Sequence, residues 1–308
     1  MRKILILGSK GFIGSSLSTY LKKKNYKIIR DKGRKKNNLL LLNNMKNLIN
    51  RHQPEIIINC LGVVGGIQWG IQNKRKIILE NNSLTTNLFN SICNKKLILI
   101  NLIANCVYPY EYSKYEEKNI FNGDIHPSVF AYGMTRRNLL STSLILNETS
   151  NVKSLNLILS NVYGPGDHFD EYRSHALGGL ISKFYKAKKN NLKKIEIWGS
   201  GKPKRDWIYI DDVCDAILIV LKNLNAVPEV LNVASNKCVS IKNLALKIKS
   251  SFKYKGNIVF NKQYPDGDPI KKFSTKLINE TINWKSKTNI DKGISKTVKY
   301  FLNLNEKK

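Results

Sequence analysis

Apolar and polar positions follow an alternating pattern over the first half of the chain. Short apolar runs predict buried strands at residues 4–7, 26–30, 55–61, 97–102 and 155–159. The longer segments between these runs predict helices at residues 15–21, at 74–94 and within 128–147. Strands that alternate with helices in this way are typical of a doubly wound parallel sheet, so we expect an α/β fold.

A glycine-rich loop, Gly8-Ser9-Lys10-Gly11-Phe12-Ile13-Gly14, joins the first strand to the first helix. Gly8 permits a tight turn, Gly11 lets the backbone approach a pyrophosphate, and Gly14 lets the helix pack closely on the strand. The helix N-terminus adds free N–H groups and the positive end of its dipole. The loop therefore predicts a Rossmann-type dinucleotide site built by Gly8, Lys10, Gly11, Phe12, Ile13 and Gly14.

The alternation breaks at Tyr163-Gly164-Pro165-Gly166, and the second half is less regular. Helices are predicted at residues 175–188, 240–252 and 290–302, and short strands at 195–198, 230–234 and 257–260. Asp211-Asp212 is predicted to cap a further helix. We expect a dinucleotide-binding part at 1–165, joined by 206–235, and a smaller α/β substrate-binding part at 166–205 and 236–308. The substrate is expected in the cleft between them.

Composition is that of a globular protein with a strong basic excess. The 308 residues carry 52 Lys and Arg against 22 Asp and Glu, a net charge of +30. The lysines are spread along the chain among many asparagines and isoleucines, which favours a compositional bias over a nucleic-acid site. Apolar stretches are too short to span a membrane, and five cysteines form no CxxC pair. We expect a cytoplasmic protein with neither a membrane segment nor a metal site.

Several ordered segments resemble one family, the extended short-chain dehydrogenase/reductases, also called the NAD-dependent epimerase/dehydratase family. Within it the chain is most similar to the GDP-L-fucose synthases, which are epimerase-reductases. The narrower matches are Val64-Gly65-Gly66-Ile67, Asn105-Cys106-Val107-Tyr108-Pro109, Asn161-Val162-Tyr163-Gly164-Pro165, Ser174-His175, residues 198–207 and Pro265-Asp266-Gly267-Asp268-Pro269. This resemblance covers essentially the whole chain and implies a nucleotide-sugar ligand.

The cofactor is predicted from the charges beside the second strand. An acid at the end of that strand favours NAD, whereas a basic residue suits the 2′-phosphate of NADP. Arg30 ends the strand, and Lys10 lies in the glycine loop, where the fucose synthases carry a basic residue. NADP(H) is therefore favoured. NAD(H) remains an alternative because Asp31 directly follows Arg30.

The resemblance implies a reductase site with two departures. Tyr132 matches the family's proton-donating tyrosine, and Arg136 stands four residues later where the family has lysine. Both are expected to contact the cofactor as well. A guanidinium does not replace an ammonium in geometry. Ala104 stands where the family has its serine donor, and a lost donor typically costs about 10²–10³ in rate. Neighbouring Asn105 is the candidate substitute.

The family's epimerisation pair and several substrate contacts are also matched. Cys106 and His175 correspond to the residues that exchange protons beside the ketone. Lys183, Arg205 and Lys271 fall where the family places cations near the diphosphate, while Ile270 replaces an expected arginine. Asn161 is expected to orient the substrate.

These features favour a nucleotide-sugar 4-keto reductase. The expected substrate is a GDP-linked 4-keto-6-deoxy hexose or heptose, reduced with NADPH, with C3/C5 epimerisation as a second activity. One alternative is an epimerase or dehydratase that recycles its bound cofactor. Another is a catalytically weakened member that binds nucleotide or RNA. A homodimer through the helices at 74–94 and 128–147 is expected from the family.

Overall fold

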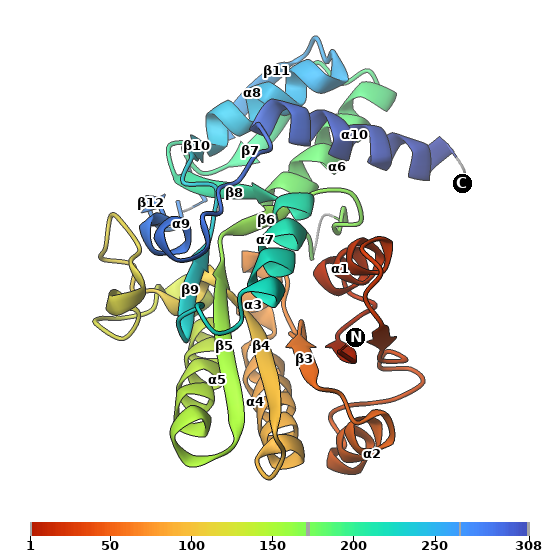
Figure 1. Ribbon diagram of the computed structural model, residues 1–308. Coiled ribbons are helices and arrows are strands. Elements are labelled where there is room, and N and C mark those ends of the chain that lie inside the picture. Colours follow the sequence, from red (N-terminus) through yellow and green to blue (C-terminus); the bar gives the residue numbers. More distant parts are fainter. Residues whose placement is uncertain (1, 171–172, 265, 307–308) are drawn as a thin grey trace.

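The computed structural model describes residues 2–170, 173–264 and 266–306. Strand β1 (Ile4–Leu7) leads through the glycine loop into helix α1 (Phe12–Lys23) (Figure 1). Gly8 has φ +73°, and a β-carbon on Gly14 would collide with the Gly8 carbonyl oxygen. Both positions therefore require glycine, one for its backbone conformation and the other for close packing.

The large sheet orders its strands β2-β1-β3-β4-β5-β9, and neighbouring strands are parallel throughout. The later strands are β2 (Ile28–Arg30), β3 (Ile56–Asn59), β4 (Leu97–Ala104), β5 (Val152–Leu159) and β9 (Val230–Val233). The chain reverses its direction of strand addition between β1 and β3. In open α/β sheets the ligand crevice lies at the carboxyl ends of such a strand pair. The sheet confirms the predicted Rossmann-type fold.

Successive side chains of β1 pack on opposite faces of the sheet. Ile4 and Ile6 belong to the buried cluster that includes α1, whereas Leu5 and Leu7 belong to the cluster that includes Met45. Helices α1 and α7 (Ile210–Lys222) contact each other, as do α2 (Leu42–His52), α4 (Lys74–Ile92) and α5 (Phe130–Thr149) in turn. Layers on both faces explain why the strands are continuously apolar.

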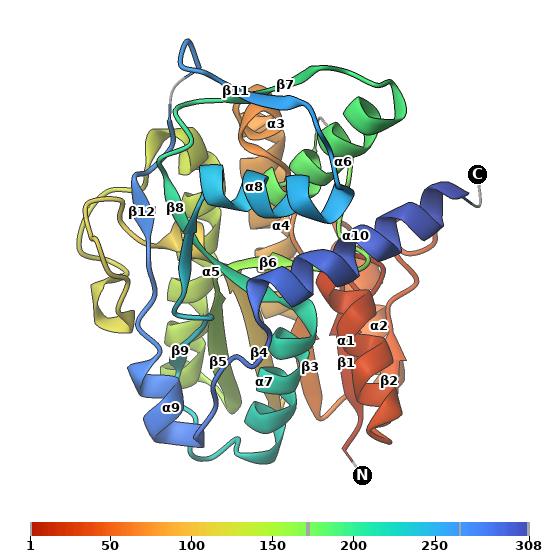
Figure 2. The ribbon, with the colours of Figure 1, turned by 90° about the horizontal axis from the view of Figure 1, so that it is seen from above.

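The remainder forms a smaller α/β part over the carboxyl ends of the large sheet's strands, at the top of Figure 1. One small sheet contains β6 (Asn161–Tyr163), β8 (Lys204–Tyr209), β10 (Cys238–Ser240) and β12 (Ile270–Lys271), and β7 (Lys194–Trp198) pairs with β11 (Asn257–Asn261). Helix α8 (Ile241–Phe252) packs against α6 (Ala176–Lys189) and α10 (Ile290–Glu306) (Figure 2). Helix α9 (Lys276–Ile282) contacts β9.

A strap, residues 108–126, ties the two parts together. It lies between the 3₁₀ turns η1 (Asn105–Val107) and η3 (Pro127–Val129) and contains η2 (Glu117–Asn119). Tyr108 and Tyr115 stack with ring centroids 4.6 Å apart, and Phe273 meets both edge-on. The Tyr115 amide donates to the Lys272 carbonyl at 2.7 Å. This aromatic contact closes one end of the cleft between the parts.

The predicted elements agree with the structure except at some boundaries and short elements. Helix α1 begins at Phe12, three residues before the predicted start, because Gly11 already serves as its N-cap. The N-cap of α7 is Tyr209, so the prediction for Asp211-Asp212 was wrong, and these acids lie in the first turn. Helices α2, α3 (Ile67–Gln72) and α9 were not predicted.

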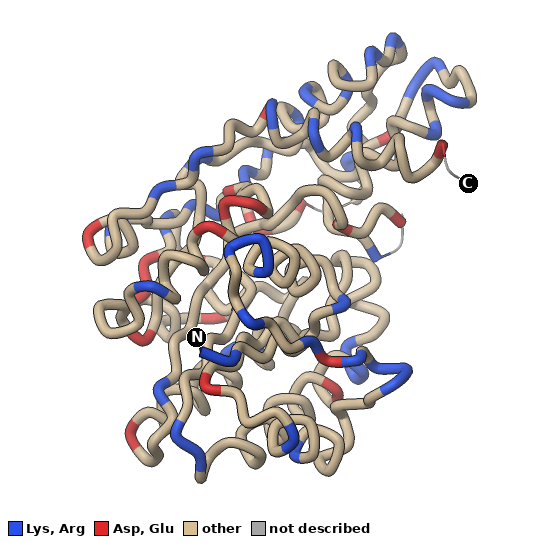
Figure 3. Tube along the Cα trace, turned by 45° about the vertical axis from the view of Figure 1, so that its right-hand side comes forward, with Lys and Arg blue, Asp and Glu red and all other residues tan. Residues whose placement is uncertain are grey.

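The domain boundaries stay a prediction, since β9 joins the large sheet whereas β8, from the segment expected to return, spans the small one. Figure 3 shows lysines and arginines along the whole trace, interspersed with acids. Across the described part of the chain, no helix has the length and apolar character needed to traverse a bilayer.

Candidate active site

The N-terminus of α1 offers unpaired donors to an anion. Gly11 is its N-cap, and within the described ranges no side chain caps the first turn and no acid lies in it. The first backbone bond of the helix is donated by Ser15 to Gly11. The N–H groups of Phe12, Ile13 and Gly14 therefore lack helical acceptors, and with the dipole they fit a pyrophosphate.

Asp31, the acid that would favour NAD, forms hydrogen bonds with the protein's own backbone. Asp31 is 5% exposed and accepts the Ser9 amide at 2.7 Å and the Gly33 amide at 3.2 Å. Arg30 donates to the Ser9 carbonyl at 2.8 Å, and the stem of Lys10 lies against Gly33. The exposed charges beside the loop are therefore cationic, which suits a ribose 2′-phosphate better than ribose hydroxyls.

Helix α5 carries Tyr132 and Arg136 to the carboxyl end of β3. A β-carbon on Gly62 would lie 3.2 Å from the Tyr132 hydroxyl oxygen, so glycine leaves that hydroxyl accessible. The Arg136 guanidinium carbon lies 5.0 Å from the centre of the Tyr132 ring. Burial raises the pKa of Tyr132 and the charge of Arg136 opposes that increase. The phenol is thus protonated at neutral pH and able to donate.

Arg136 is anchored to the loop that follows β3. It is 2% exposed and donates to the Leu61 carbonyl at 3.2 Å and to the Asn81 side-chain oxygen at 2.9 Å. Asn81 in turn exchanges hydrogen bonds with the backbone of Val63. Among the described residues, the Arg136 Nε has no hydrogen-bond partner. Arg136 therefore holds the 61–63 backbone in place. It does so through the fixed fork of guanidinium N–H donors, which the ammonium of a lysine lacks.

Asn81 is a site residue that the sequence analysis missed. It lies within α4 and is completely buried. Its sequence neighbours Glu80, Asn82 and Ser83 are polar, so no local pattern distinguished it from a surface residue.

Alanine stands at the position where the family resemblance implies a serine donor. Ala104 ends β4, and the next residue, Asn105, directs its amide to the Asn161 side-chain oxygen at 3.4 Å. Asn161 donates to the Asp206 carbonyl at 2.8 Å. Asn105 and Asn161 are thus brought together and link β4 to the small sheet. That contact uses one of the two N–H donors of Asn105, and its role as a substitute for the missing hydroxyl stays a prediction.

Cys106 and His175 approach the cleft from different parts of the chain. Cys106 is buried in η1, and burial raises its pKa to about 11, against the lowering effect of Lys271 and Arg136. His175 is the N-cap of α6 and keeps an exposed surface. The surrounding protein and His168 lower the pKa of His175.

Backbone contacts hold the segment before His175 against the loop after β3. The Gly66 amide donates to the Arg173 carbonyl at 2.9 Å, and a β-carbon on Gly66 would lie 2.6 Å from the Ser174 oxygen. The Arg173 guanidinium carbon lies 5.1 Å from the Trp69 ring centre. These contacts bring His175 to the same loop, 61–66, that Arg136 fixes.

Two cations and one carboxylate line the side of the cleft formed by the second part. Lys271 is 8% exposed, and its ammonium lies 3.7 Å from an Asp268 oxygen. Burial lowers the pKa of both Lys271 and Arg205, while Asp268 raises both. Lys271 also interacts electrostatically with Cys106. The structure therefore gathers Arg205, Lys271 and Cys106 around one buried carboxylate, which the sequence analysis did not single out.

Lys183 lies elsewhere, against β7. Its ammonium donates to the Glu196 carbonyl at 3.0 Å and lies 5.2 Å from the Trp198 ring centre. Trp198 is 47% exposed and stacks on Tyr264. Lys183 is therefore held beside an exposed aromatic pair. Within the described ranges, it is not among the residues that shift the pKa of Arg205 or Lys271.

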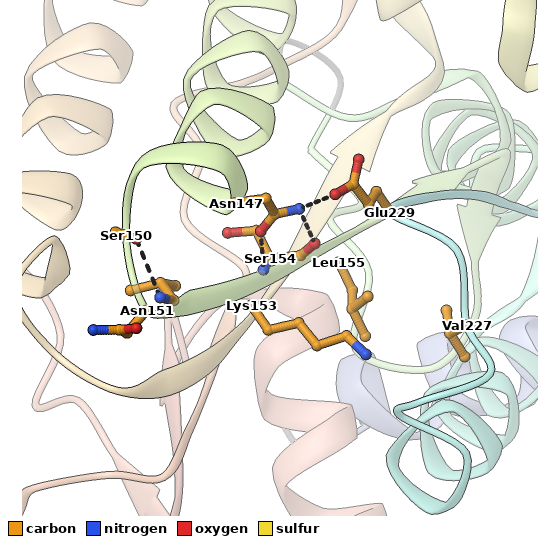
Figure 4. Close-up of a pocket in the computed structure, with 9 residues that line it drawn as sticks. Asn147, Ser150, Asn151, Lys153, Ser154, Leu155, Val227 and Glu229 are labelled. Carbon is orange, nitrogen blue, oxygen red and sulfur yellow. Dashed lines mark hydrogen bonds between the residues drawn. The ribbon is translucent and has the colours of Figure 1, made fainter.

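A separate hollow of about 300 Å³ lies at the amino-terminal end of β5, away from these residues. Figure 4 shows Asn147 between Ser154 and Glu229, to both of which it donates. Lys153 donates to the Leu224 carbonyl at 2.7 Å. These polar groups join α5, β5 and the approach to β9, which indicates a structural function for this region.

Comparison with known proteins identifies the family. The model of the NAD dependent epimerase/dehydratase family matches residues 4–234. The chain belongs to this family. It is 31% identical over 304 residues to the GDP-L-colitose synthase of Yersinia pseudotuberculosis, with 98% of each covered. It is 28% identical to the GDP-L-fucose synthase of Sinorhizobium fredii, with 98% of this chain and 96% of that protein covered.

Among solved structures, the chain resembles a GDP-L-fucose synthetase from Naegleria fowleri bound to NADP. The TM-score is 0.88 at 25% identity, and the match covers 99% of this chain and 95% of that one. The family explains why the glycine loop and the α5 tyrosine occur together. Ala104 and Arg136 differ from the serine and lysine that the resemblance implies at these positions.

Proposed function

We propose that this protein reduces the 4-keto group of a GDP-linked sugar with NADPH. The observation that carries the proposal is the position of Tyr132, with its hydroxyl against Gly62 at the carboxyl end of β3. The uncapped α1 N-terminus lies at the adjacent strand β1, and the cations Arg205 and Lys271 line the facing part. Relatives named GDP-L-colitose synthase and GDP-L-fucose synthase support a GDP-sugar substrate.

In this reduction, the residues of this chain supply the proton. NADPH, when bound at the glycine loop, supplies the hydride that forms the new C4–H bond. Tyr132 donates its hydroxyl proton to the carbonyl oxygen, so the ketone becomes an alcohol, and solvent then reprotonates the phenolate. The Arg136 charge stabilises that phenolate. The first-turn amides of α1 would hold the cofactor's pyrophosphate, and Lys10 and Arg30 would supply positive charge for a 2′-phosphate.

Epimerisation is a second candidate activity, supported by the protonation of Cys106 and His175. The Cys106 thiol, with a pKa of about 11, keeps its proton at neutral pH and suits a donor. The lowered pKa of His175 leaves its imidazole neutral and suits a base. We propose that these two residues together carry out the proton exchange beside the ketone.

The proposed enzyme is a cytoplasmic homodimer. None of the five cysteines, which all lie in described segments, forms a disulfide, as is usual in reducing compartments. Leu79 on α4 and Ile145 on α5 are 56% and 57% exposed, and Met134 on α5 is 40% exposed. The two helices lie side by side (Figure 1), so these residues are available for a second copy.

The test is NADPH consumption with a panel of GDP-linked 4-keto hexoses and heptoses, compared for wild type and Tyr132→Phe. We expect stoichiometric oxidation by the wild type and a loss of about 10²–10⁴ in kcat for the variant, with NADPH affinity retained. Products formed in D₂O and read by mass and NMR report epimerisation. Tyr110→Phe, an exposed tyrosine of the strap, is the matched control. Turnover that is unaffected by Tyr132→Phe, or product without net NADPH oxidation, would overturn the proposal.

A further inference from the structure

Asp268 is a buried carboxylate, and one of its oxygens has no hydrogen-bond partner among the described residues. Its side chain is 3% exposed. One oxygen, Oδ2, accepts the Tyr115 hydroxyl at 2.9 Å and lies 3.7 Å from the Lys271 ammonium. The other, Oδ1, has no hydrogen-bond partner within the described part of the chain. A buried acceptor without a donor costs free energy, so such an atom in a native fold calls for an explanation.

Asp268 lies close to the loop that follows β3. A β-carbon on the preceding residue, Gly267, would lie 3.2 Å from the Arg205 guanidinium and 4.0 Å from Ile67 of α3. Helix α3 follows the loop at the carboxyl end of β3, on which Tyr132 and Arg136 converge. Asp268 also acts electrostatically on Arg205, Lys271 and His126. It therefore lies where the second part meets the catalytic edge of the large sheet.

The surrounding groups leave Oδ1 as an acceptor for a neutral donor. Lys271 and Arg205 already supply cationic charge, and Tyr115 occupies Oδ2. The Arg205 guanidinium directs one nitrogen to the Lys204 carbonyl at 2.8 Å. His126 accepts the Ser128 amide at Nδ1, which places the proton of a neutral imidazole on Nε2. A carboxylate oxygen accepts a hydrogen bond from a hydroxyl, and a hydroxyl can also accept from an N–H group such as the Nε2 of His126.

Building on the proposed function, we infer that Asp268 accepts a hydrogen bond from a hydroxyl of the sugar and so selects GDP-sugars that carry this hydroxyl. Sites that hydrogen-bond a substrate hydroxyl strongly reject analogues without it, because the site's own polar group is then left unpaired. Asp268 thus binds the sugar, whereas Arg205 and Lys271 bind the diphosphate. This division predicts that the two halves of the ligand respond differently to loss of the Asp268 charge.

The experiment measures binding of GDP and of GDP-mannose to the NADP⁺-loaded protein by calorimetry. For Asp268→Asn we expect GDP-mannose to bind about 10- to 100-fold more weakly, the effect of losing a hydrogen bond to a charged group. GDP, which lacks the mannosyl group, should bind equally or more tightly, because removing a carboxylate leaves the positive charges of Lys271 and Arg205 less neutralised. Asp268→Glu, which keeps the charge but moves the carboxylate, should weaken GDP-mannose alone.

The control is Asp124→Asn, which removes an exposed carboxylate from the strap and should change neither affinity. Retained NADP⁺ binding by each variant shows that it folds. Equal weakening of GDP and GDP-mannose, or unchanged GDP-mannose binding in both Asp268 variants, would overturn the inference while leaving the proposed function standing. Wild-type protein that binds neither GDP nor GDP-mannose would overturn both.

Discussion

Asp167 couples folding to pH in the loop between β6 and α6. The residue is 8% exposed, and its carboxylate accepts the His168 amide at 2.7 Å. Burial raises the pKa of Asp167 from 3.8 to about 7. Because the folded protein binds this proton more tightly than the unfolded chain, the group favours folding most at low pH. That contribution is lost as pH rises from about 4 to about 7.

We predict that Asp167→Asn flattens this part of the pH dependence. At pH 8 the variant should be more stable than the wild type, by no more than about 4 kcal/mol, because it no longer buries an ionised carboxylate. At pH 4 the two should be nearly equal. Urea unfolding at several pH values measures the difference, with Asp124→Asn as an exposed control. Parallel pH profiles for wild type and Asp167→Asn would contradict the prediction.

Single residues also show what the sequence could and could not predict. The glycine loop was predictable because its turn and close packing depend on local spacing and backbone conformation. The role of Tyr132 stays a prediction that the family resemblance implies. Asp31 was predicted from its position alone, as a reason to keep NAD open, whereas its bonds to Ser9 and Gly33 depend on folding. Asp268 and Asn81 act through partners distant in sequence, such as Tyr115 and Arg136, and such pairs are invisible before the fold is known.

At the scale of elements, α4 and α5 combine buried and exposed apolar positions. Their inner sides contribute Leu88 and Leu139 to the core beneath the sheet. Leu79 and Ile145 remain exposed, and the Asn138 amide donates to the Asn82 side chain between the helices at 3.2 Å. Exposed apolar side chains on neighbouring long helices suit burial against a second copy of the same pair.

We predict that Leu79→Glu together with Ile145→Glu yields a monomer. The buried charges would face their symmetry mates across an isologous interface and repel them. Sedimentation velocity measures the mass. Leu246→Glu on α8, which replaces a side chain with 46% exposure, is the matched control and should stay dimeric. A wild-type monomer, or a dimer that survives both substitutions, would rule out this interface.

Helices and strands were predicted correctly where their residues are continuously buried. They were missed where the element forms only through tertiary contacts. The strands of the large sheet are covered on both faces and therefore appear as apolar runs. Helix α2 was missed because its eleven residues bury few side chains, Met45, Leu48 and Ile49, among asparagines and basic residues. Strand β12 has two residues and exists through its pairing with β8. No local pattern could indicate it.

Over the whole molecule, the net charge of +30 has no matching single patch. Lysines and arginines are distributed over both parts, with acids between them (Figure 3). Buried Lys271 and partly buried Arg205 lie near the same carboxylate, that of Asp268. The general charge thus attracts anions weakly from all sides, whereas the cleft can hold one anion by direct contact.

We predict a shallow salt dependence for GDP binding. Between 0.05 and 0.5 M NaCl the dissociation constant should rise about 3- to 10-fold, because few charges contact a diphosphate and buried pairs are poorly screened. A single-stranded RNA should bind more weakly than GDP and lose binding steeply over this range. Fluorescence titration measures both. RNA that binds more tightly than GDP at 0.15 M salt would favour the RNA-binding alternative.

The aromatic contact between the strap and Phe273 joins residues that are synthesised at different times. Tyr108 and Tyr115 emerge from the ribosome long before the segment that covers them, which follows about 160 residues later. The glycine loop and strands β1 to β5 precede that segment, so a nascent chain can already present its dinucleotide cradle. Asp268 and Lys271 arrive with the same late segment. The nascent protein therefore gains its cofactor site first and its sugar-binding wall near the end of synthesis.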